Sequence, residues 1–119
     1  MKVMFVDDDF VEIKVLKRHF KEPLDFDIFY ANSYYEAKEI VEKENIDLIF
    51  SDFNLGDADG TQFKEDFSNI KLYILSGSGV SSTQKEVFDK YQIELIDKDF
   101  NRDYLITLDT IITESVKVN

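Results

Sequence analysis

The sequence contains no cysteine, and this absence excludes disulfide bonds and thiolate metal sites. It has only one proline and four glycines, and it shows no linker and no low-complexity tract. Long hydrophobic runs are missing as well. The first run, residues 3–6, is too short for a signal peptide, and no other run approaches membrane-spanning length. We therefore expect a cytoplasmic protein with no membrane partner.

Positive charge is also scarce, with 14 lysines and arginines against 25 acidic residues and a net charge of -11. A surface of this kind repels nucleic acids and anionic membranes, so we expect no direct binding to nucleic acid. The composition is otherwise ordinary for a globular protein, with 44% hydrophobic and 33% charged residues. The length of 119 residues fits a single domain over residues 1–119.

Five short apolar runs alternate with longer amphipathic segments. The runs are rich in valine, isoleucine, leucine and aromatic residues, and they cover residues 3–6, 26–30, 48–50, 72–75 and 93–96. Several of them lack polar alternation, as expected of parallel strands that are covered on both faces. They recur every roughly 20–25 residues, the length of a right-handed crossover through one helix. The pattern predicts an α/β fold, a three-layer doubly wound five-stranded parallel sheet.

Helical patterns fill the intervals between these runs. The first helix has one apolar face, and Asp9 with Glu12 predicts a capping box at its start. The residues expected on that face are Val11, Val15, Leu16 and Phe20. Ser33 with Glu36 predicts a second capping box, and Pro23 falls where the chain must leave the first helix. Further helices are expected over residues 61–67, 82–91 and 102–116, the last capped by Asn101 and followed by no output domain.

Polar residues follow four of the five predicted strands. In a parallel sheet these carboxyl-terminal strand ends meet at one edge, where ligands of such folds bind. The residues at this edge are Asp7, Asp8 and Asp9 after the first strand, Asp52 after the third, Ser76 and Gly77 after the fourth, and Asp97, Lys98 and Asp99 after the fifth. The sequence therefore predicts one polar site built from distant segments.

The acidic residues of this edge suggest a metal site. Asp9 is best interpreted as a helix cap. Asp7 and Asp8 would meet Asp52 if the first and third strands are neighbours, and three carboxylates repel one another unless a cation joins them. Oxygen ligands from so few side chains suit Mg²⁺ better than a fully caged Ca²⁺. A carboxylate held ionised beside such an ion can attack a phosphoryl group to give an acyl phosphate, and Asp52 is the candidate.

The loop after Asp52 and the two remaining strand ends allow other interpretations. A calcium loop of the EF-hand type would place Leu55 in its first ligand position, so we reject it and interpret Asp57 and Asp59 as turn formers. The Ser76 hydroxyl could donate to a phosphoryl oxygen, or it could belong to a simple Ser-Gly turn. Lys98 could bind a phosphate oxygen, or it could form a surface ion pair with its neighbours. We expect His19 at the surface or its boundary.

The four strand ends together resemble those of the response-regulator receiver family of two-component signalling. The resemblance extends over essentially the whole chain. Each piece is weak alone, but their combined spacing is specific. The matching stretches are Val6-Asp7-Asp8, Ser51-Asp52-Phe53-Asn54 with Asp59-Gly60, Leu75-Ser76-Gly77, and Lys98. The resemblance implies a flavodoxin-like strand order of 2-1-3-4-5.

The resemblance also implies a function. Asp52 would accept a phosphoryl group from a histidine kinase or a histidine phosphotransfer protein, and the receiver would itself catalyse the transfer. Mg²⁺ would be bound by Asp8 and Asp52 directly, by the backbone carbonyl of Asn54, and by Asp7 through water. The chain would then be mainly a signalling switch rather than an enzyme of metabolism.

The switch would be read at the surface of the protein. By the resemblance, Ser76 and Lys98 would contact the phosphoryl group and pass the change to a face formed by the fourth helix, the fifth strand and the fifth helix. That face would bind a downstream protein that the sequence does not identify. Three positions depart from the family: Gly56 and Asp99 replace usual prolines, and Leu95 replaces a usual aromatic residue.

Two rival functions remain open. A degenerate receiver would use the same fold as an unphosphorylated interaction module. A haloacid-dehalogenase-like phosphatase would use the Asp-x-Asp of Asp7 and Asp9, with Ser76 and Lys98 in support. The phosphatase is disfavoured because the chain is short, lacks a convincing acidic pair after Lys98 and leaves Asp52 without a role. A flavodoxin is disfavoured because acids stand where its phosphate loop would be.

Overall fold

The computed structural model describes residues 1–21, 24–77, 81–98 and 102–118. Within these ranges five strands and five helices alternate along the chain, as the apolar runs predicted. The break predicted at Pro23, the cap predicted at Asn101 and the departure at Asp99 lie outside the described residues.

The five strands form one parallel sheet in the order β2-β1-β3-β4-β5. The strands are β1 (Lys2–Val6), β2 (Asp27–Ala31), β3 (Leu48–Asp52), β4 (Lys71–Ser76) and β5 (Glu94–Asp97). The α/β fold class and the strand order 2-1-3-4-5 are therefore confirmed. Since β1 and β3 are neighbours in register, their carboxyl ends lie side by side.

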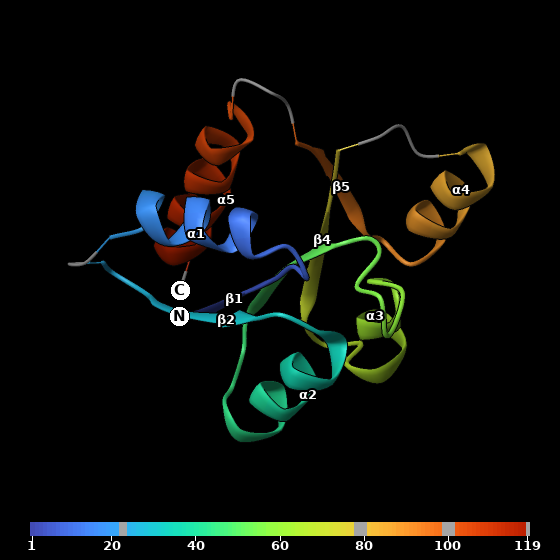
Figure 1. The fold of residues 1–119 in the computed structure, drawn as a ribbon, viewed down its shortest axis with the longest axis horizontal. Helices are drawn as coiled ribbons and strands as arrows, with labels where there is room; N and C mark the ends of the chain where they lie inside the picture. The colour runs from blue at the N-terminus through green and yellow to red at the C-terminus, as the bar shows by residue number, and fades with distance from the viewer. Residues whose placement is uncertain (22–23, 78–80, 99–101, 119) are drawn as a thin grey trace.

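Helices cover both faces of the sheet (Figure 1). One face packs against α1 (Phe10–His19) and α5 (Tyr104–Val118). The other face packs against α2 (Tyr34–Lys43), α3 (Gln62–Asp66) and α4 (Ser82–Lys90). Alternate residues of β1 divide between the two cores: Val3 and Phe5 face α1 and α5, whereas Met4 and Val6 face the other layer. All four are essentially inaccessible, as expected of a central parallel strand.

A row of aromatic rings crosses the sheet beneath α1 and α5. Tyr30, Phe5, Phe50 and Tyr73 stand in register on β2, β1, β3 and β4. Their rings stack with centroid distances of 5.9, 5.2 and 4.8 Å between successive members. Such offset stacks add to the free energy gained from burial alone. Tyr73 ends this row at β4.

The first helix differs from the prediction in its buried face. Ile13 and Leu16 are buried in α1, and Phe20 is buried just after it, whereas Val11 is 60% exposed. Spacings of three and seven residues place Ile13, Leu16 and Phe20 on one side of a helix of 3.6 residues per turn. Val11 lies on the opposite side, so its assignment to the core was wrong.

Side chains also tie α1 to the C-terminal helix. Asp9 caps α1 by accepting the Val11 N–H at 2.8 Å, but Glu12 does not complete the predicted capping box. It accepts from Arg102 at 3.1 Å and from the Tyr104 hydroxyl at 2.9 Å. His19 Nε2 also lies 2.8 Å from Asp109 Oδ2 of α5, at the surface boundary where the sequence placed this histidine.

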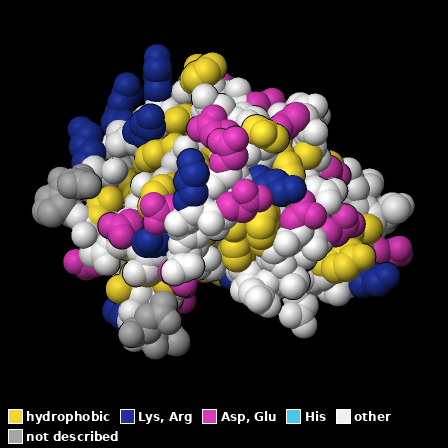
Figure 2. Space-filling view, turned by 90° about the horizontal axis from the view of Figure 1, so that it is seen from below, with side chains coloured by type: hydrophobic (Ala, Val, Ile, Leu, Met, Phe, Trp, Pro, Cys, Tyr) yellow, Lys and Arg dark blue, Asp and Glu magenta, His cyan; other side chains and the backbone are white. Residues whose placement is uncertain are grey.

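The charge of the surface is uneven. Figure 2 shows Lys and Arg side chains gathered toward one corner of the face in view, while acidic side chains spread over the rest. Exposed cations follow one another closely along α1 and just after it, at Lys14, Lys17, Arg18 and Lys21. The net charge of -11 therefore describes the molecule as a whole and not each part of its surface.

Candidate functional site

Three carboxylates meet at the carboxyl-terminal edge of the sheet. Asp7 and Asp8 directly follow β1, and Asp52 is the last residue of β3. One ligand oxygen from each of them lies within 4.8 Å of the other two. Asp7 is buried, Asp52 is partly buried and Asp8 is exposed. The adjacency of β1 and β3 thus brings together the three acids that the sequence placed at strand ends.

Lys98 extends from the end of β5 over these acids. Its Nζ lies 2.8 Å from Asp7 Oδ2 and 3.7 Å from Asp52 Oδ1. The side chains of Lys98 and Asp7 are only 15% and 4% exposed. Interpreting Lys98 as a member of a surface ion pair is therefore wrong, because its ammonium group is directed into the acidic cluster.

The cluster has more negative than positive charge. Burial acts to lower the pKa of Lys98, but its hydrogen bond to Asp7 and the charges of Asp7 and Asp52 outweigh this, so the pKa is raised. Burial raises the pKa of Asp52, and the charges of Asp7 and Asp8 add to this rise against the opposing effects of Lys98 and of the Phe53 backbone. One ammonium does not balance three carboxylates, which leaves a site that attracts a cation.

The donor atoms of this edge fit Mg²⁺. All of them are carboxylate oxygens, the hard ligands that Mg²⁺ prefers, and their small number leaves positions for water and substrate. The backbone carbonyl oxygen of Asn54 could add one further ligand, since the contacts of Asn54 described next do not use it. The bridge between Asn54 and Asp59 uses the Phe53 carbonyl and the Leu55 N–H, and the Asn54 side chain accepts the Gly56 N–H at 3.0 Å. Neither contact uses the Asn54 backbone oxygen.

Two glycines shape the loop between β3 and α3. A Cβ atom at Gly60 would lie 2.5 Å from the Asp52 carbonyl oxygen, so no larger residue fits against the end of β3. Gly56 has a φ of 82°, in the left-handed region that proline cannot adopt, and a Cβ there would lie 3.8 Å from Asp8 Oδ2. The loop therefore passes close to both Asp52 and Asp8.

The same loop is attached to a neighbouring helix by Asp57. Its two carboxylate oxygens accept the backbone N–H groups of Tyr34 and Tyr35, at 3.0 and 3.1 Å, in the first turn of α2. Ser33 caps the next free N–H group of that turn, at Glu36. Asp57 thus lies in the turn between Leu55 and Ala58, as predicted, and its side chain also caps a helix 22 and 23 residues away.

Asp59 behaves as the sequence suggested. Its Oδ1 accepts the Thr61 N–H at 2.8 Å and the Thr61 hydroxyl at 2.7 Å, which is the local hydrogen bonding of a turn-forming aspartate. No local pattern distinguishes it from Asp57, because the partners of Asp57 lie in another helix. The capping role of Asp57 was therefore missed, because Ser33 already supplied a predicted cap for α2 and nothing in the sequence indicated a second one.

Ser76 and Gly77 complete the edge. Ser76 is the last residue of β4, is 9% exposed, and accepts the Lys98 N–H at its backbone carbonyl at 2.8 Å. This bond places the start of the Lys98 side chain beside Ser76. A Cβ atom at Gly77 would meet no atom within 4 Å, so the surface next to Ser76 is open on that side.

A comparison with known families shows which family the chain belongs to. A family model described as the response regulator receiver domain matches residues 3–108. The chain belongs to this family. Receivers of response regulators act in two-component signalling, and their flavodoxin-like fold is the one described above. The match also disfavours the phosphatase alternative, which rested on Asp7 and Asp9 alone among the acids.

One curated relative supports the assignment. The sensory transduction protein LytR of Streptococcus agalactiae serotype V is 25% identical over 107 residues. That match covers 86% of this chain and 44% of LytR, so the receiver spans less than half the length of that relative.

Two solved structures share the fold. The isolated REC domain of RcsB from Salmonella enterica serovar Typhimurium, in the presence of phosphomimetic BeF3-, superimposes with a TM-score of 0.78 at 15% identity, over 96% of this chain and 88% of that one. A structure of the P1 domain of CheA3 in complex with CheY6 from R. sphaeroides matches with a TM-score of 0.67 at 22% identity, over 94% and 96% of the two chains. At these identities the likeness concerns the fold alone.

Among the helices described in this receiver, none is long and apolar enough to cross a membrane.

Proposed function

We propose that this receiver accepts a phosphoryl group on Asp52 in a Mg²⁺-dependent reaction and so switches a partner-binding face. The observation that supports this most is the convergence of Asp7, Asp8 and Asp52 within 4.8 Å, with Lys98 reaching Asp7 and Asp52 from β5. Asp52 is the acid whose position at the end of a central strand fits an acceptor, because it is partly buried and open to the edge.

Each side chain has a distinct part in the proposed transfer. A carboxylate oxygen of Asp52 attacks the phosphorus of a phosphohistidine, the O–P bond forms, and the P–N bond breaks with its electron pair left on the imidazole. Asp8, Asp52 and the Asn54 carbonyl would hold Mg²⁺ directly, and Asp7 would hold it through water. When bound, Mg²⁺ neutralises charge on the phosphoryl oxygens and aligns them for in-line attack.

Ser76 and Lys98 would then stabilise the product. Phosphorylation adds up to about two negative charges to an acidic edge. The Ser76 hydroxyl can donate one hydrogen bond to a phosphoryl oxygen, and the Lys98 ammonium can exchange its contact with Asp52 for a phosphoryl oxygen. Because Ser76 ends β4 and Lys98 directly follows β5, their inward movement would alter the face made by α4, β5 and α5, where a downstream protein would bind.

The phosphoryl donor would be a histidine kinase or a histidine phosphotransfer protein. Family membership supports this class of donor. One of the structures that match this fold is a complex of the CheA3 P1 domain with CheY6, and the RcsB domain was solved in the presence of a phosphomimetic. A degenerate receiver that only binds partners is the second candidate, and Mg²⁺-dependent labelling separates the two.

The test is chemical labelling of the whole chain. Wild type, Asp52→Asn and the exposed-loop control Asp25→Asn are incubated with acetyl phosphate and Mg²⁺, and acyl phosphates are trapped by borohydride reduction. Mass spectrometry should find one reduced residue, at position 52, in wild type and in the control, and none in Asp52→Asn. Labelling of Asp52→Asn at the wild-type rate would refute the acceptor assignment, and no labelling of any protein would favour the degenerate receiver.

A further inference from the structure

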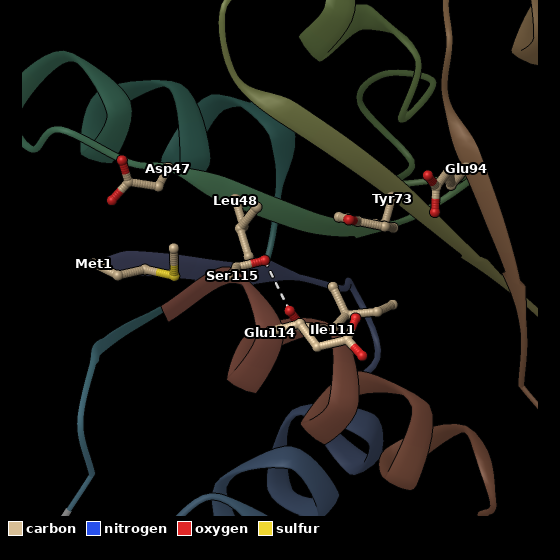
Figure 3. A pocket seen from close by; sticks show the side chains of 8 residues that line it. All are labelled: Met1, Asp47, Leu48, Tyr73, Glu94, Ile111, Glu114 and Ser115. Carbon is tan, nitrogen blue, oxygen red and sulfur yellow. Dashed lines mark hydrogen bonds between the residues drawn. The ribbon is translucent and has the colours of Figure 1, made fainter. Parts of the chain in front are cut away.

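A pocket of about 560 Å³ opens at the edge of the sheet opposite to the acidic cluster (Figure 3). Its strand wall includes Leu48 and Glu94, the first residues of β3 and β5, and its other wall is the C-terminal half of α5, with Ile111 and Glu114. Asp52 ends β3 at the far edge of the sheet. The pocket is therefore separate from the proposed phosphorylation site.

The pocket contains a polar group that has no hydrogen-bond partner among the described residues. Tyr73 is only 7% exposed, and its hydroxyl makes no hydrogen bond with any residue in the described part of the chain. Figure 3 shows this hydroxyl directed toward the interior of the pocket, between Leu48 and Glu94. The stack of its ring on Phe50, at 4.8 Å, fixes that direction. No buried side-chain oxygen or nitrogen of the described residues lacks a partner, so this hydroxyl is open to the pocket, where a ligand can bond to it in place of water.

Three carboxylates line the same pocket as this hydroxyl. Asp47, Glu94 and Glu114 all line the pocket, and all three are exposed at its rim. Asp47 accepts the backbone N–H of Lys2 at 2.8 Å, but neither it nor Glu114 forms an ion pair with a described side chain. The lining therefore repels anions and leaves two carboxylates for a cation.

One ammonium group of the chain already contacts two residues that line this pocket. Lys71 Nζ lies 3.3 Å from Glu94 Oε1 and 5.6 Å from the centroid of the Tyr73 ring. An ammonium group is thus compatible with both the ring and the acid. Burial, with a smaller effect of Glu94, raises the pKa of Tyr73, so the hydroxyl stays protonated and can accept an N–H with its oxygen.

We propose that this pocket binds an ammonium or guanidinium group on an aliphatic chain. The Tyr73 oxygen accepts an N–H of the cation, and Glu114 and Asp47 balance its charge. Met1, Leu48 and Ile111, which also line the pocket, contact the aliphatic chain. The cation belongs either to a small free amine or to a lysine or arginine side chain of another protein, and the chemistry of the contact is the same.

The proposal is tested by titrating the full chain with two probes at saturating Mg²⁺, which keeps the acidic cluster at the other edge occupied. Agmatine represents the free amines, and a blocked Ala-Arg-Ala peptide represents the protein side chain. Binding is followed by calorimetry and by backbone amide shifts. Tyr73→Phe, which keeps the ring stack, and Glu114→Gln should each weaken binding about threefold to tenfold. The matched exposed controls Tyr91→Phe and Glu86→Gln should bind as wild type does.

The outcomes are distinct. Amide shifts around Leu48 and Ile111 that depend on Tyr73 and Glu114 support the pocket, and the tighter of the two probes identifies the source of the cation. Equal binding by wild type, Tyr73→Phe and Glu114→Gln overturns the proposal, as do shifts confined to Asp7, Asp8 and Asp52, or no binding of either probe. Thermal unfolding of each variant establishes that it is folded, and none of these results depends on phosphorylation of Asp52.

Discussion

Replacing Lys98 with alanine should destabilise the protein in the absence of Mg²⁺ far more than removal of an exposed lysine. The Lys98 ammonium lies 2.8 Å from Asp7 Oδ2, and the side chain of Asp7 is only 4% exposed. Without Lys98, Asp7 keeps the Asp9 N–H at 2.9 Å but has no cation, and Asp52 loses its only described ion pair. A buried carboxylate would be left beside a second one.

The expected loss follows from the burial of this pair. Removing one partner of a buried ion pair costs about 3–5 kcal/mol, whereas a whole exposed pair contributes only about 0–1 kcal/mol. The lower end applies here because Asp52 is 24% exposed and Asp8 is open to water, which screens part of the charge. We expect a loss of about 3 kcal/mol in the free energy of unfolding, or a fall in Tm of roughly 10 °C for a chain of this size.

The assay is urea unfolding in EDTA and again in Mg²⁺, followed by circular dichroism. The matched control is Lys71→Ala, which breaks an ion pair of 3.3 Å whose side chains are 42% and 59% exposed. Mg²⁺ should narrow the gap between Lys98→Ala and wild type, because a bound cation replaces the lost charge and ligand binding stabilises the folded state. A loss in EDTA no greater than that of Lys71→Ala would refute the buried-pair argument.

Three further changes test neighbouring parts of the site. Asp8→Asn relieves repulsion among carboxylates within 4.8 Å of one another, so it should stabilise the metal-free protein by about 1 kcal/mol and weaken Mg²⁺ binding in calorimetry; lower stability in EDTA would contradict this. Asp52→Asn removes a carboxyl group whose pKa burial raises, and a raised pKa disfavours folding wherever that group is ionised. In EDTA, the Asp52→Asn variant should therefore be more stable than wild type, with the full gain at pH values above the pKa of Asp52 in the folded protein. The gain should disappear as the pH falls below the ordinary value of 3.8, so a gain in urea unfolding that does not change with pH would contradict this argument. Asp57→Ala removes the cap on the Tyr34 and Tyr35 N–H groups and should lower the free energy of unfolding by about 1 kcal/mol. The loss should be smaller in a protein that already carries Ser33→Ala, and strictly additive losses would show that the two caps act independently.

The sequence determined the elements of this fold because each depends on near neighbours in the chain. Uninterrupted apolar runs such as the one around Ile49 predicted central parallel strands, and Ser33 and Asp9 predicted helix starts that the structure contains. The sequence also ordered the polar residues of the site. Parallel strands expose their carboxyl ends at one edge, so Asp7, Asp52 and Lys98 had to lie on the same side of the sheet once the strands were assigned.

Only the tertiary structure decided which of these groups meet. The adjacency of β1 and β3, which brings Asp52 to Asp7, came from the family resemblance and not from the residues themselves. Asp57 binds α2 across 22 and 23 residues, and Glu12 binds Arg102 across 90 residues. In each case the distant hydrogen bond forms in place of a local one that the sequence favoured. Tyr73 falls inside the apolar run predicted as the fourth strand, yet it also lines a pocket. Local patterns record backbone geometry over a few residues, whereas these contacts depend on how whole helices pack against the sheet.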